Sequence, residues 1–184
     1  HPNGEDDEVD SKKARIKLAR WVRLHPYNIS QKVEVIVEHF RRHVAKELDG
    51  QAKAMIVTQS REHALRYWQR LGEYIADKGY ADLKALVAFS GDLNIDGNVW
   101  TEATANGFAE TELPRRFDTD EYQVLVVAEK YQTGFDQPKL VAMYVDKKLA
   151  GLQAVQTLAR LNRTRAGKER TFVLDFQNTM DEIR

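Results

Sequence analysis

Short apolar runs alternate with helix-like segments along most of the chain. Five runs of mainly apolar residues predict buried strands, at 53–58, 84–89, 122–128, 140–145 and 171–176. Apolar residues repeat at helical spacing over 61–76 and over 152–162, between these runs. Continuous apolar strands that alternate with helices are typical of a parallel sheet covered on both faces. The pattern therefore predicts an α/β fold of three layers, with a mainly parallel central sheet flanked by helices.

Another helix is predicted ahead of the first strand. Asn28 and Gln31 have the spacing of a capping box, apolar residues then repeat every three or four positions, and Gly50 follows as a stop signal. His39 and His43 lie one turn apart in this helix, a spacing that can bind a metal ion. Arg41 and Arg42 lie between the two histidines and would repel a cation, so we expect no metal there.

Residues 92–116 are polar and contain glycine and proline, so we expect a loop there. The first ten residues contain five acids and few apolar side chains, and we interpret 1–14 as an acidic tail or linker remnant. Basic and apolar residues then interleave from Lys12 to Arg23, which suits either a surface element or a segment that follows a phosphate backbone.

Composition narrows the possibilities. A chain of 184 residues suits one compact domain, and 42% hydrophobic with 30% charged residues is a globular balance. Lysine plus arginine and aspartate plus glutamate both number 28, so no overall positive charge marks a nucleic-acid partner. The absence of cysteine excludes thiol catalysis and disulfides. The chain starts with His rather than Met, and we expect it to be a processed product or a fragment.

Several nucleotide-binding and hydrolase motifs are missing from the sequence. The only Gly-Lys pair, at 167–168, is followed by Glu169 where a P-loop needs serine or threonine. No apolar run ends in Asp-Glu, and no G-x-G-x-x-G or G-x-S-x-G occurs. We therefore expect that the chain cannot hydrolyse ATP on its own.

The loop 128–138 is a candidate binding segment. Gly134 permits a close backbone approach, and Asp136 offers an acceptor for a ribose hydroxyl. By themselves these residues favour a simple turn between two strands.

The predicted helix 152–162 carries a polar stripe. Gln156, Arg160 and Arg163 fall within about 60° of one another at about 100° per residue, and such side chains suit the recognition of phosphate. Ala154, Leu158 and Leu161 are expected to face the core. A solvated polar helix face would show the same stripe.

Together these segments resemble a known family. TGFDQPKLVAMYVDKKL, from Thr133, and LQAVQTLARLNR, from Leu152, are similar to motifs V and VI of superfamily 2 helicases, in the form found in the motor subunit of type I restriction enzymes. KAMIVTQSREHALRY resembles the motif IV region of that family, and VAFSG, the later Thr101-Glu102 and HPYNISQKVEVIVEHF also fit. The resemblance covers roughly 15–178. Ala159 and Asn162 replace the glycines of the common helicase motif VI, and Ala128 stands where many helicases have a DNA-contacting threonine.

The resemblance implies a second RecA-like lobe over 15–178, the lobe without a P-loop, and the start of a linker at 179–184. It implies that Arg163 is an arginine finger and Arg160 its companion at the γ-phosphate, and that Gly134, Asp136 and Gln156 bind the nucleotide. ATP and Mg²⁺ would be held mainly by a first lobe that this chain lacks, and no metal ligand is expected here.

The same resemblance implies a role on double-stranded DNA. The loops at the strand ends would contact the DNA backbone without reading its sequence, through Thr58, Ser60, Ser90, Gly91 and Thr133. The implied partners are the first lobe and the nuclease domain of the same polypeptide, and the methyltransferase and specificity subunits of the complex. A location in the bacterial or archaeal cytoplasm follows, with no membrane partner.

The residues themselves are also consistent with two other functions. Asp146, Lys147 and Lys148 form a D-x-K that could hold Mg²⁺ with Asp136 in a nuclease, although the spacing is loose. A nucleic-acid or protein-binding module without any ATPase role could use the basic segment 12–23 and the basic stretch 160–170.

Overall fold

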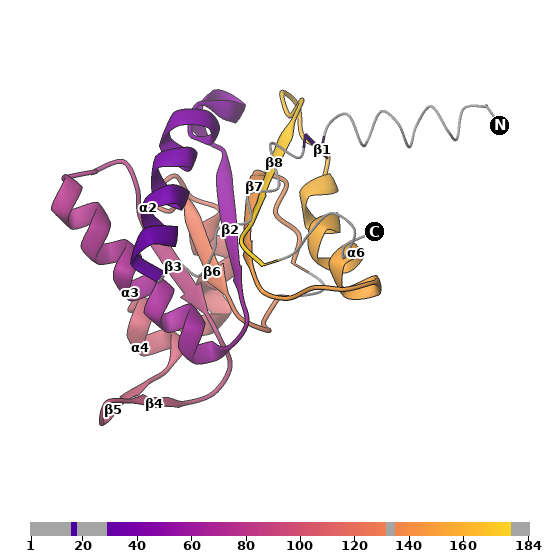
Figure 1. The fold of residues 1–184 in the computed structure, drawn as a ribbon. Coiled ribbons are helices and arrows are strands. Elements are labelled where there is room, and N and C mark those ends of the chain that lie inside the picture. Colours follow the sequence, from indigo (N-terminus) through magenta and orange to yellow (C-terminus); the bar gives the residue numbers. More distant parts are fainter. Residues whose placement is uncertain (1–15, 18–28, 132–134, 178–184) are drawn as a thin grey trace.

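A parallel sheet is the centre of the molecule. The computed structural model describes residues 16–17, 29–131 and 135–177. Within them the sheet has six strands in the order β1-β8-β7-β2-β6-β3, and all neighbours run parallel (Figure 1). The strands are β1 Ile16–Lys17, β2 Lys53–Thr58, β3 Ala85–Ala88, β6 Val124–Val127, β7 Leu140–Asp146 and β8 Thr171–Asp175.

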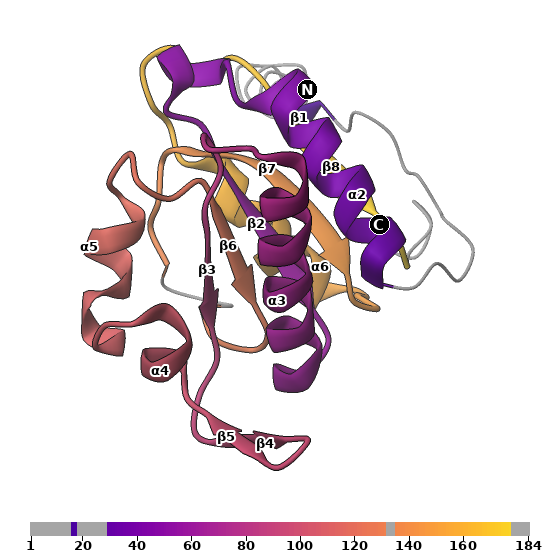
Figure 2. The same ribbon diagram turned by 90° about the vertical axis from the view of Figure 1, so that its left-hand side faces the viewer.

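Helices cover both faces of this sheet. One face packs against α2 (Ile29–His39) and the long α3 (Arg61–Lys78), and the opposite face packs against α5 (Leu113–Phe117) and α6 (Leu152–Leu158). Figure 2 looks onto α2 and α3, with α6 behind the sheet. Each face has its own apolar core, built from alternate residues of the same strands. The prediction of a three-layer α/β, RecA-like fold is confirmed.

The five strands expected from the sequence are all present. Every side chain of β2, β6, β7 and β8 is buried, as continuous apolar runs require. In the register, Val57 lies opposite Val127, and Thr58 lies opposite Asp146. The carboxyl ends of β2, β6 and β7 therefore meet at one edge of the sheet, where the DNA-contacting loops were predicted.

The expected helix before β2 is interrupted. After α2 the chain continues as a π-helical segment, Phe40–Val44, and a 3₁₀ turn, Glu47–Gly50. Phe40 and Val44 are nevertheless buried, as their spacing predicted. Asn28, the predicted cap, lies outside the described residues, as do the segments 1–14 and 179–184.

The prediction of a loop over 92–116 was wrong. The strands β4 (Leu93–Ile95) and β5 (Asn98–Trp100) form a hairpin. Two short helices follow, α4 (Glu102–Asn106) and, after the 3₁₀ turn Glu110–Glu112, α5. Local signals explain these elements. Asp96 and Gly97 take the positive φ angles of a tight hairpin turn, and Thr101 caps α4 with a capping box.

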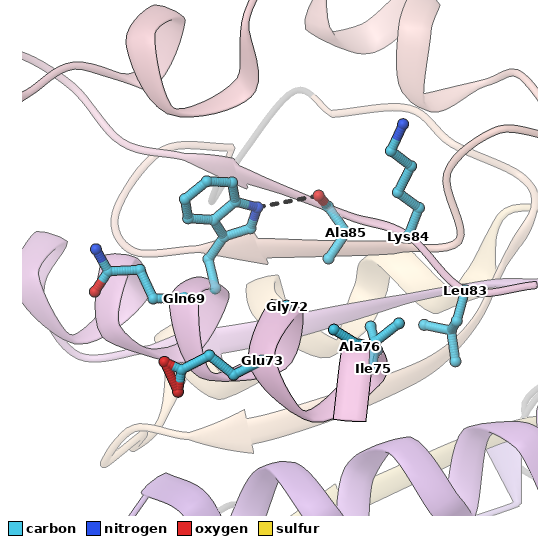
Figure 3. Close-up of a pocket in the computed structure, with 9 residues that line it drawn as sticks. Gln69, Gly72, Glu73, Ile75, Ala76, Leu83, Lys84 and Ala85 are labelled. Atoms are coloured by element: carbon cyan, nitrogen blue, oxygen red, sulfur yellow. Dashed lines mark hydrogen bonds between the residues drawn. The ribbon is translucent and has the colours of Figure 1, made fainter. Parts of the chain in front are cut away.

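This region protects the open edge of the sheet at β3. The side-chain amide of Asn106 accepts from the Val87 nitrogen at 3.0 Å and donates to the Val87 oxygen at 2.7 Å, as a neighbouring strand would. From α3, the indole of Trp68 donates to the Ala85 oxygen at 3.0 Å, the dashed contact in Figure 3. Side chains therefore satisfy main-chain groups that would otherwise be free to pair with another chain.

None of the described helices is both long enough and apolar enough to cross a membrane.

Candidate nucleotide and nucleic-acid site

Two residues predicted from separate motifs lie together in the structure. The Arg163 Nε atom is 3.1 Å from Asp136 Oδ1, although 27 positions separate them in the sequence. Both side chains are largely exposed, at 57% and 67%. Asp136 lies in the connection that precedes β7, and Arg163 lies in the connection that precedes β8, so two neighbouring strands bring them together. The pair offers a carboxylate acceptor and guanidinium donors side by side on the surface.

Arg160 is buried, which the sequence did not predict. Arg160 is only 6% exposed, and its Nη1 atom donates to the sulfur of Met55 in β2 at 3.2 Å. Nε and Nη2 are buried without a hydrogen-bond partner. Burial lowers the pKa of Arg160 to about 10, since no charge-compensating carboxylate offsets the desolvation. A buried guanidinium with two free donors is a costly arrangement that an anionic oxygen would relieve.

The predicted polar stripe is therefore only partly correct. Regular α-helix ends at Leu158, and the chain tightens to a 3₁₀ segment, Ala159–Asn162. Arg160 lies within this segment and is buried, whereas Arg163 follows the segment in an extended conformation and is exposed, as is Gln156. Ala154 and Leu161 are buried and Leu158 is half-buried against the core, as expected. Gly134 and Thr133 lie outside the described residues.

A lysine that the sequence analysis did not single out as a site residue joins the same two connections. Lys168 Nζ donates to the Pro138 oxygen at 3.2 Å and to the Arg163 oxygen at 2.9 Å. Burial lowers the pKa of this lysine to about 8. A half-buried lysine among exposed neighbours has no sequence signal, because its burial depends on how the chain turns back at Gly167.

The predicted DNA-contacting residues differ in how exposed they are to an approaching ligand. Thr58 is fully buried and donates its hydroxyl to the Val127 oxygen at 2.9 Å, so it holds β2 to β6 rather than facing a ligand. Ser60 is exposed, and its side chain caps α3 by accepting from the His63 nitrogen at 3.0 Å. The expected direct contact from Thr58 is therefore incompatible with this structure.

The loop after β3 lies beside the start of α3. The Arg61 guanidinium donates to the oxygens of Ser90 and Asp92, both at 2.9 Å. Gly91 has a φ of +75°, and a Cβ there would lie 3.3 Å from Arg61 Nη1. Ser60, Ser90 and Gly91 are thus exposed on adjoining loops at the carboxyl edge of the sheet, and Arg61 fixes their spacing.

Glu102 ties this loop to the one that follows β6. The carboxylate is 1% exposed, and its Oε1 accepts from the Phe89 nitrogen at 3.1 Å and from Lys130 Nζ at 2.8 Å. Oε2 is buried without a partner, and burial raises the pKa of Glu102. Glu102 is part of the family pattern in the sequence, but no contact was predicted for it.

Asp146, the acid of the possible nuclease site, is fully buried and already paired. Lys32 donates to both carboxylate oxygens at 3.1 and 3.0 Å, Tyr67 donates at 2.6 Å, and Gln177 donates at 2.7 Å. His63 Nε2 lies 3.5 Å from the same carboxylate. Burial alone would raise the pKa of Asp146, but the hydrogen bonds outweigh it and hold this pKa below its usual value.

This arrangement argues against a Mg²⁺-dependent nuclease. Asp146 is enclosed by donors, whereas Asp136 is exposed and pairs with Arg163. His39 and His43 have rings 5.0 Å apart, and His39 Nδ1 is engaged with the Tyr144 hydroxyl at 2.7 Å. Residues 29–131 and 135–177 contain no cluster of three or more potential metal ligands.

A hollow of about 730 Å³ lies elsewhere, between α3 and β3 (Figure 3). Its lining includes Trp68, Gly72, Ile75 and Leu83, and none of the predicted site residues belongs to it. We do not associate it with the nucleotide.

Comparison with known proteins agrees with the fold and the motifs. The family described as type I restriction enzyme subunit R domain 3 matches residues 101–178. A Methanocaldococcus jannaschii protein assigned as the MjaVIIP type I restriction enzyme endonuclease subunit is 28% identical over 87% of this chain and 16% of that protein. The HindI endonuclease subunit of Haemophilus influenzae is 36% identical over 39% of this chain and 7% of that protein. The chain thus spans about a sixth of the length of its first curated relatives.

Solved structures show the same architecture. A fragment assigned as an HsdR subunit of a type I restriction enzyme from Vibrio vulnificus YJ016 matches 98% of this chain and 30% of that one, with a TM-score of 0.60 at 16% identity. The C-terminal domain of the DEAD-box protein Dbp5 matches 92% of this chain and 81% of that one, with a TM-score of 0.55 at 14% identity. Residues 101–178 therefore match the R-subunit family of type I restriction enzymes, and the chain shares its fold with the C-terminal domain of a DEAD-box protein.

Proposed function

We propose that the chain is the second motor lobe of an ATP-dependent double-stranded DNA translocase within a type I restriction endonuclease. In this role it completes an ATP site at the boundary with a first lobe of the same polypeptide and grips the DNA backbone. The observation that carries the proposal is the contact between Asp136 and Arg163, which joins the two motifs on one surface. The buried guanidinium of Arg160, in which Nε and Nη2 have no hydrogen-bond partner, supports it further.

The residues present suit a nucleotide. Asp136 would accept from the ribose hydroxyls, and Arg163 would donate to the γ-phosphate as charge develops there. Arg160 has two free donors for an anionic oxygen, although its burial requires the anion to reach a guanidinium that solvent scarcely contacts. Gln156 and Gly134 complete the proposed nucleotide contacts. Such arginines typically contribute about 10³–10⁵ in rate to phosphoryl transfer.

Mg²⁺ and most of the phosphate contacts would come from the first lobe, so the isolated chain should not turn over ATP. Bound there, the ion would supply charge neutralisation at the phosphate oxygens. The nuclease domain, the methyltransferase and specificity subunits and a cytoplasmic location belong to the same proposal.

For the DNA grip we propose the exposed loops at the carboxyl edge, with Ser60, Ser90 and Gly91. Thr133 remains a candidate. Thr58 is not proposed again as a direct contact, because its hydroxyl is buried and bonded to the Val127 oxygen. Main-chain nitrogens and hydroxyls can bind phosphates without reading bases, as a motor that moves along any sequence requires.

The test compares Arg163→Ala with Arg165→Ala in the full-length subunit. Arg165 is a matched control, since it is exposed, lies two residues away and bonds to Gln51 at 2.7 Å instead of Asp136. DNA-stimulated ATP hydrolysis should fall about 10³-fold or more for Arg163→Ala and stay near wild type for Arg165→Ala. DNA affinity should be preserved in both.

The competing binding module makes the opposite prediction. If Arg163 contacts only DNA, its removal weakens DNA binding and reduces the dependence of affinity on salt concentration, while any ATP turnover at saturating DNA is unchanged. That result would contradict the motor proposal.

A further inference from the structure

Lys168 links the backbone of the two segments that carry Asp136 and Arg163. Its ammonium group donates to the carbonyl oxygen of Pro138, two residues after Asp136, at 3.2 Å. It also donates to the carbonyl oxygen of Arg163 itself at 2.9 Å. One side chain therefore fixes the distance between two connections that are 25 residues apart in the sequence.

The local chain folding directs this lysine inward. The backbone nitrogen of Lys168 donates to the backbone oxygen of Arg165 at 3.0 Å, which closes a turn. Gly167 takes a φ of +85° in this turn. Residues 162–167, 169 and 170 are exposed, whereas Lys168 is half-buried. A surface lysine ordinarily leaves its ammonium in water, so the two carbonyl contacts indicate a specific role in holding the segments.

The direct ion pair between Asp136 and Arg163 is the second link between the same segments. In the proposed function these two side chains turn to different parts of the nucleotide, Asp136 to the ribose and Arg163 to the γ-phosphate. Their ion pair must then open when ATP binds. The Lys168 contacts can persist, because they use main-chain carbonyls that the nucleotide does not need.

We propose that Lys168 is a positioning residue that holds the backbone of Arg163 against the Asp136 segment while ATP occupies the site. The inference rests on the proposed function, since it gives Lys168 a task only if Arg163 acts on ATP. Lys168 need not touch the nucleotide. Its effect on turnover should pass through Arg163, and removal of its ammonium should loosen the position from which that guanidinium reaches the γ-phosphate.

The experiment measures DNA-stimulated ATP hydrolysis by the full-length subunit at saturating DNA. Lys168→Met should lower kcat about tenfold or more and change KM less than about threefold, because an interaction that positions a transition-state group acts on kcat. Lys168→Arg, which keeps a charged donor, should restore kcat to within about threefold of wild type. Lys78→Met removes a lysine from the exposed end of α3 and should leave kcat unchanged.

Non-additivity separates positioning from a general effect on folding. In an Arg163→Ala background, Lys168→Met should lower the residual kcat less than about twofold, since no guanidinium remains to be positioned. An equal fall in both backgrounds would overturn the proposal, as would a wild-type kcat for Lys168→Met or a failure of Lys168→Arg to restore activity. If Lys168→Met does not fold, Lys168→Gln replaces it, with the same outcomes required.

The two proposals fail in different ways. A normal kcat for Arg163→Ala would contradict the motor function and remove the basis for the role of Lys168. A collapse of kcat for Arg163→Ala together with a normal kcat for Lys168→Met would contradict only the role of Lys168.

Discussion

Replacement of Arg160 by methionine should make the isolated chain more stable. Arg160 is 6% exposed, its Nη1 lies 3.2 Å from the sulfur of Met55, and two of its nitrogens have no partner. A buried charge without a compensating acid costs free energy in the folded state. Methionine keeps a long, unbranched side chain in the same space and removes the charge.

The size of the effect follows from the pKa. Burial lowers the pKa of Arg160 from its usual value to about 10. Each unit of pKa corresponds to about 1.4 kcal/mol, so at neutral pH the folded state carries a penalty of about 3 kcal/mol for keeping this group charged. The lost packing of the guanidinium offsets part of the gain, and we expect Arg160→Met to raise the free energy of unfolding by about 1–2 kcal/mol.

Urea unfolding of the 184-residue chain at pH 7, followed by circular dichroism, measures this difference. The control is Arg165→Met, which removes an exposed guanidinium and should change stability by less than about 0.5 kcal/mol. A loss of more than about 1 kcal/mol for Arg160→Met would refute the reasoning, since it would mean that the buried guanidinium stabilises the fold. In the full-length subunit the same substitution should abolish ATP turnover, so that stability and function change in opposite directions.

Two further predictions concern buried charges elsewhere in the fold. Lys32→Met leaves the fully buried carboxylate of Asp146 without its cation. It should lower the free energy of unfolding at pH 7, measured in urea, by about 3–5 kcal/mol. A loss below about 1 kcal/mol would contradict this, since it would mean that Tyr67 and Gln177 suffice to stabilise the buried carboxylate. Burial lowers the pKa of Lys53 to about 8, so between pH 8 and pH 10.5 the unfolded state binds more protons than the folded state and stability should rise with pH. Lys53 is 2% exposed, and its titration should contribute about 3 kcal/mol to this rise in the free energy of unfolding. Lys53→Met should remove that contribution. Parallel curves of stability against pH for the wild type and the variant from pH 7 to pH 10 would contradict this.

The architecture was predictable because it depends on apolar runs. Strands such as 53–58 and 140–146 are buried on both faces, so each leaves a continuous apolar signal. The hairpin within 92–116 was missed because its strands have only three residues each and its polar turn dominates the composition. The Asp96-Gly97 pair was the available signal for it, flanked by alternating apolar residues.

The proximity of two motifs was predictable from the sequence, whereas the burial of single side chains was not. The family resemblance implied that Asp136 and Arg163 serve one nucleotide site, and the structure places their side chains 3.1 Å apart, while their roles stay predictions. A uniform helical spacing of 100° placed Arg160 on an exposed stripe with Arg163, but the regular helix ends at Leu158 and the chain is extended at Arg163, so Arg160 is buried and Arg163 is exposed. No local pattern indicates which lysine will be buried against carbonyl oxygens, so the contacts of Lys168 emerge only from the tertiary fold.

The central claim is that an arginine of this lobe completes an ATP site formed with a first lobe. The most direct measurement is the kcat of DNA-stimulated ATP hydrolysis for Arg163→Ala and Arg165→Ala in the full-length subunit, with DNA affinity measured in parallel. Our account predicts a fall of about 10³-fold or more for Arg163→Ala alone, with DNA affinity unchanged. Equal turnover in the two variants, or a loss of DNA affinity that accounts for the whole effect, would contradict it.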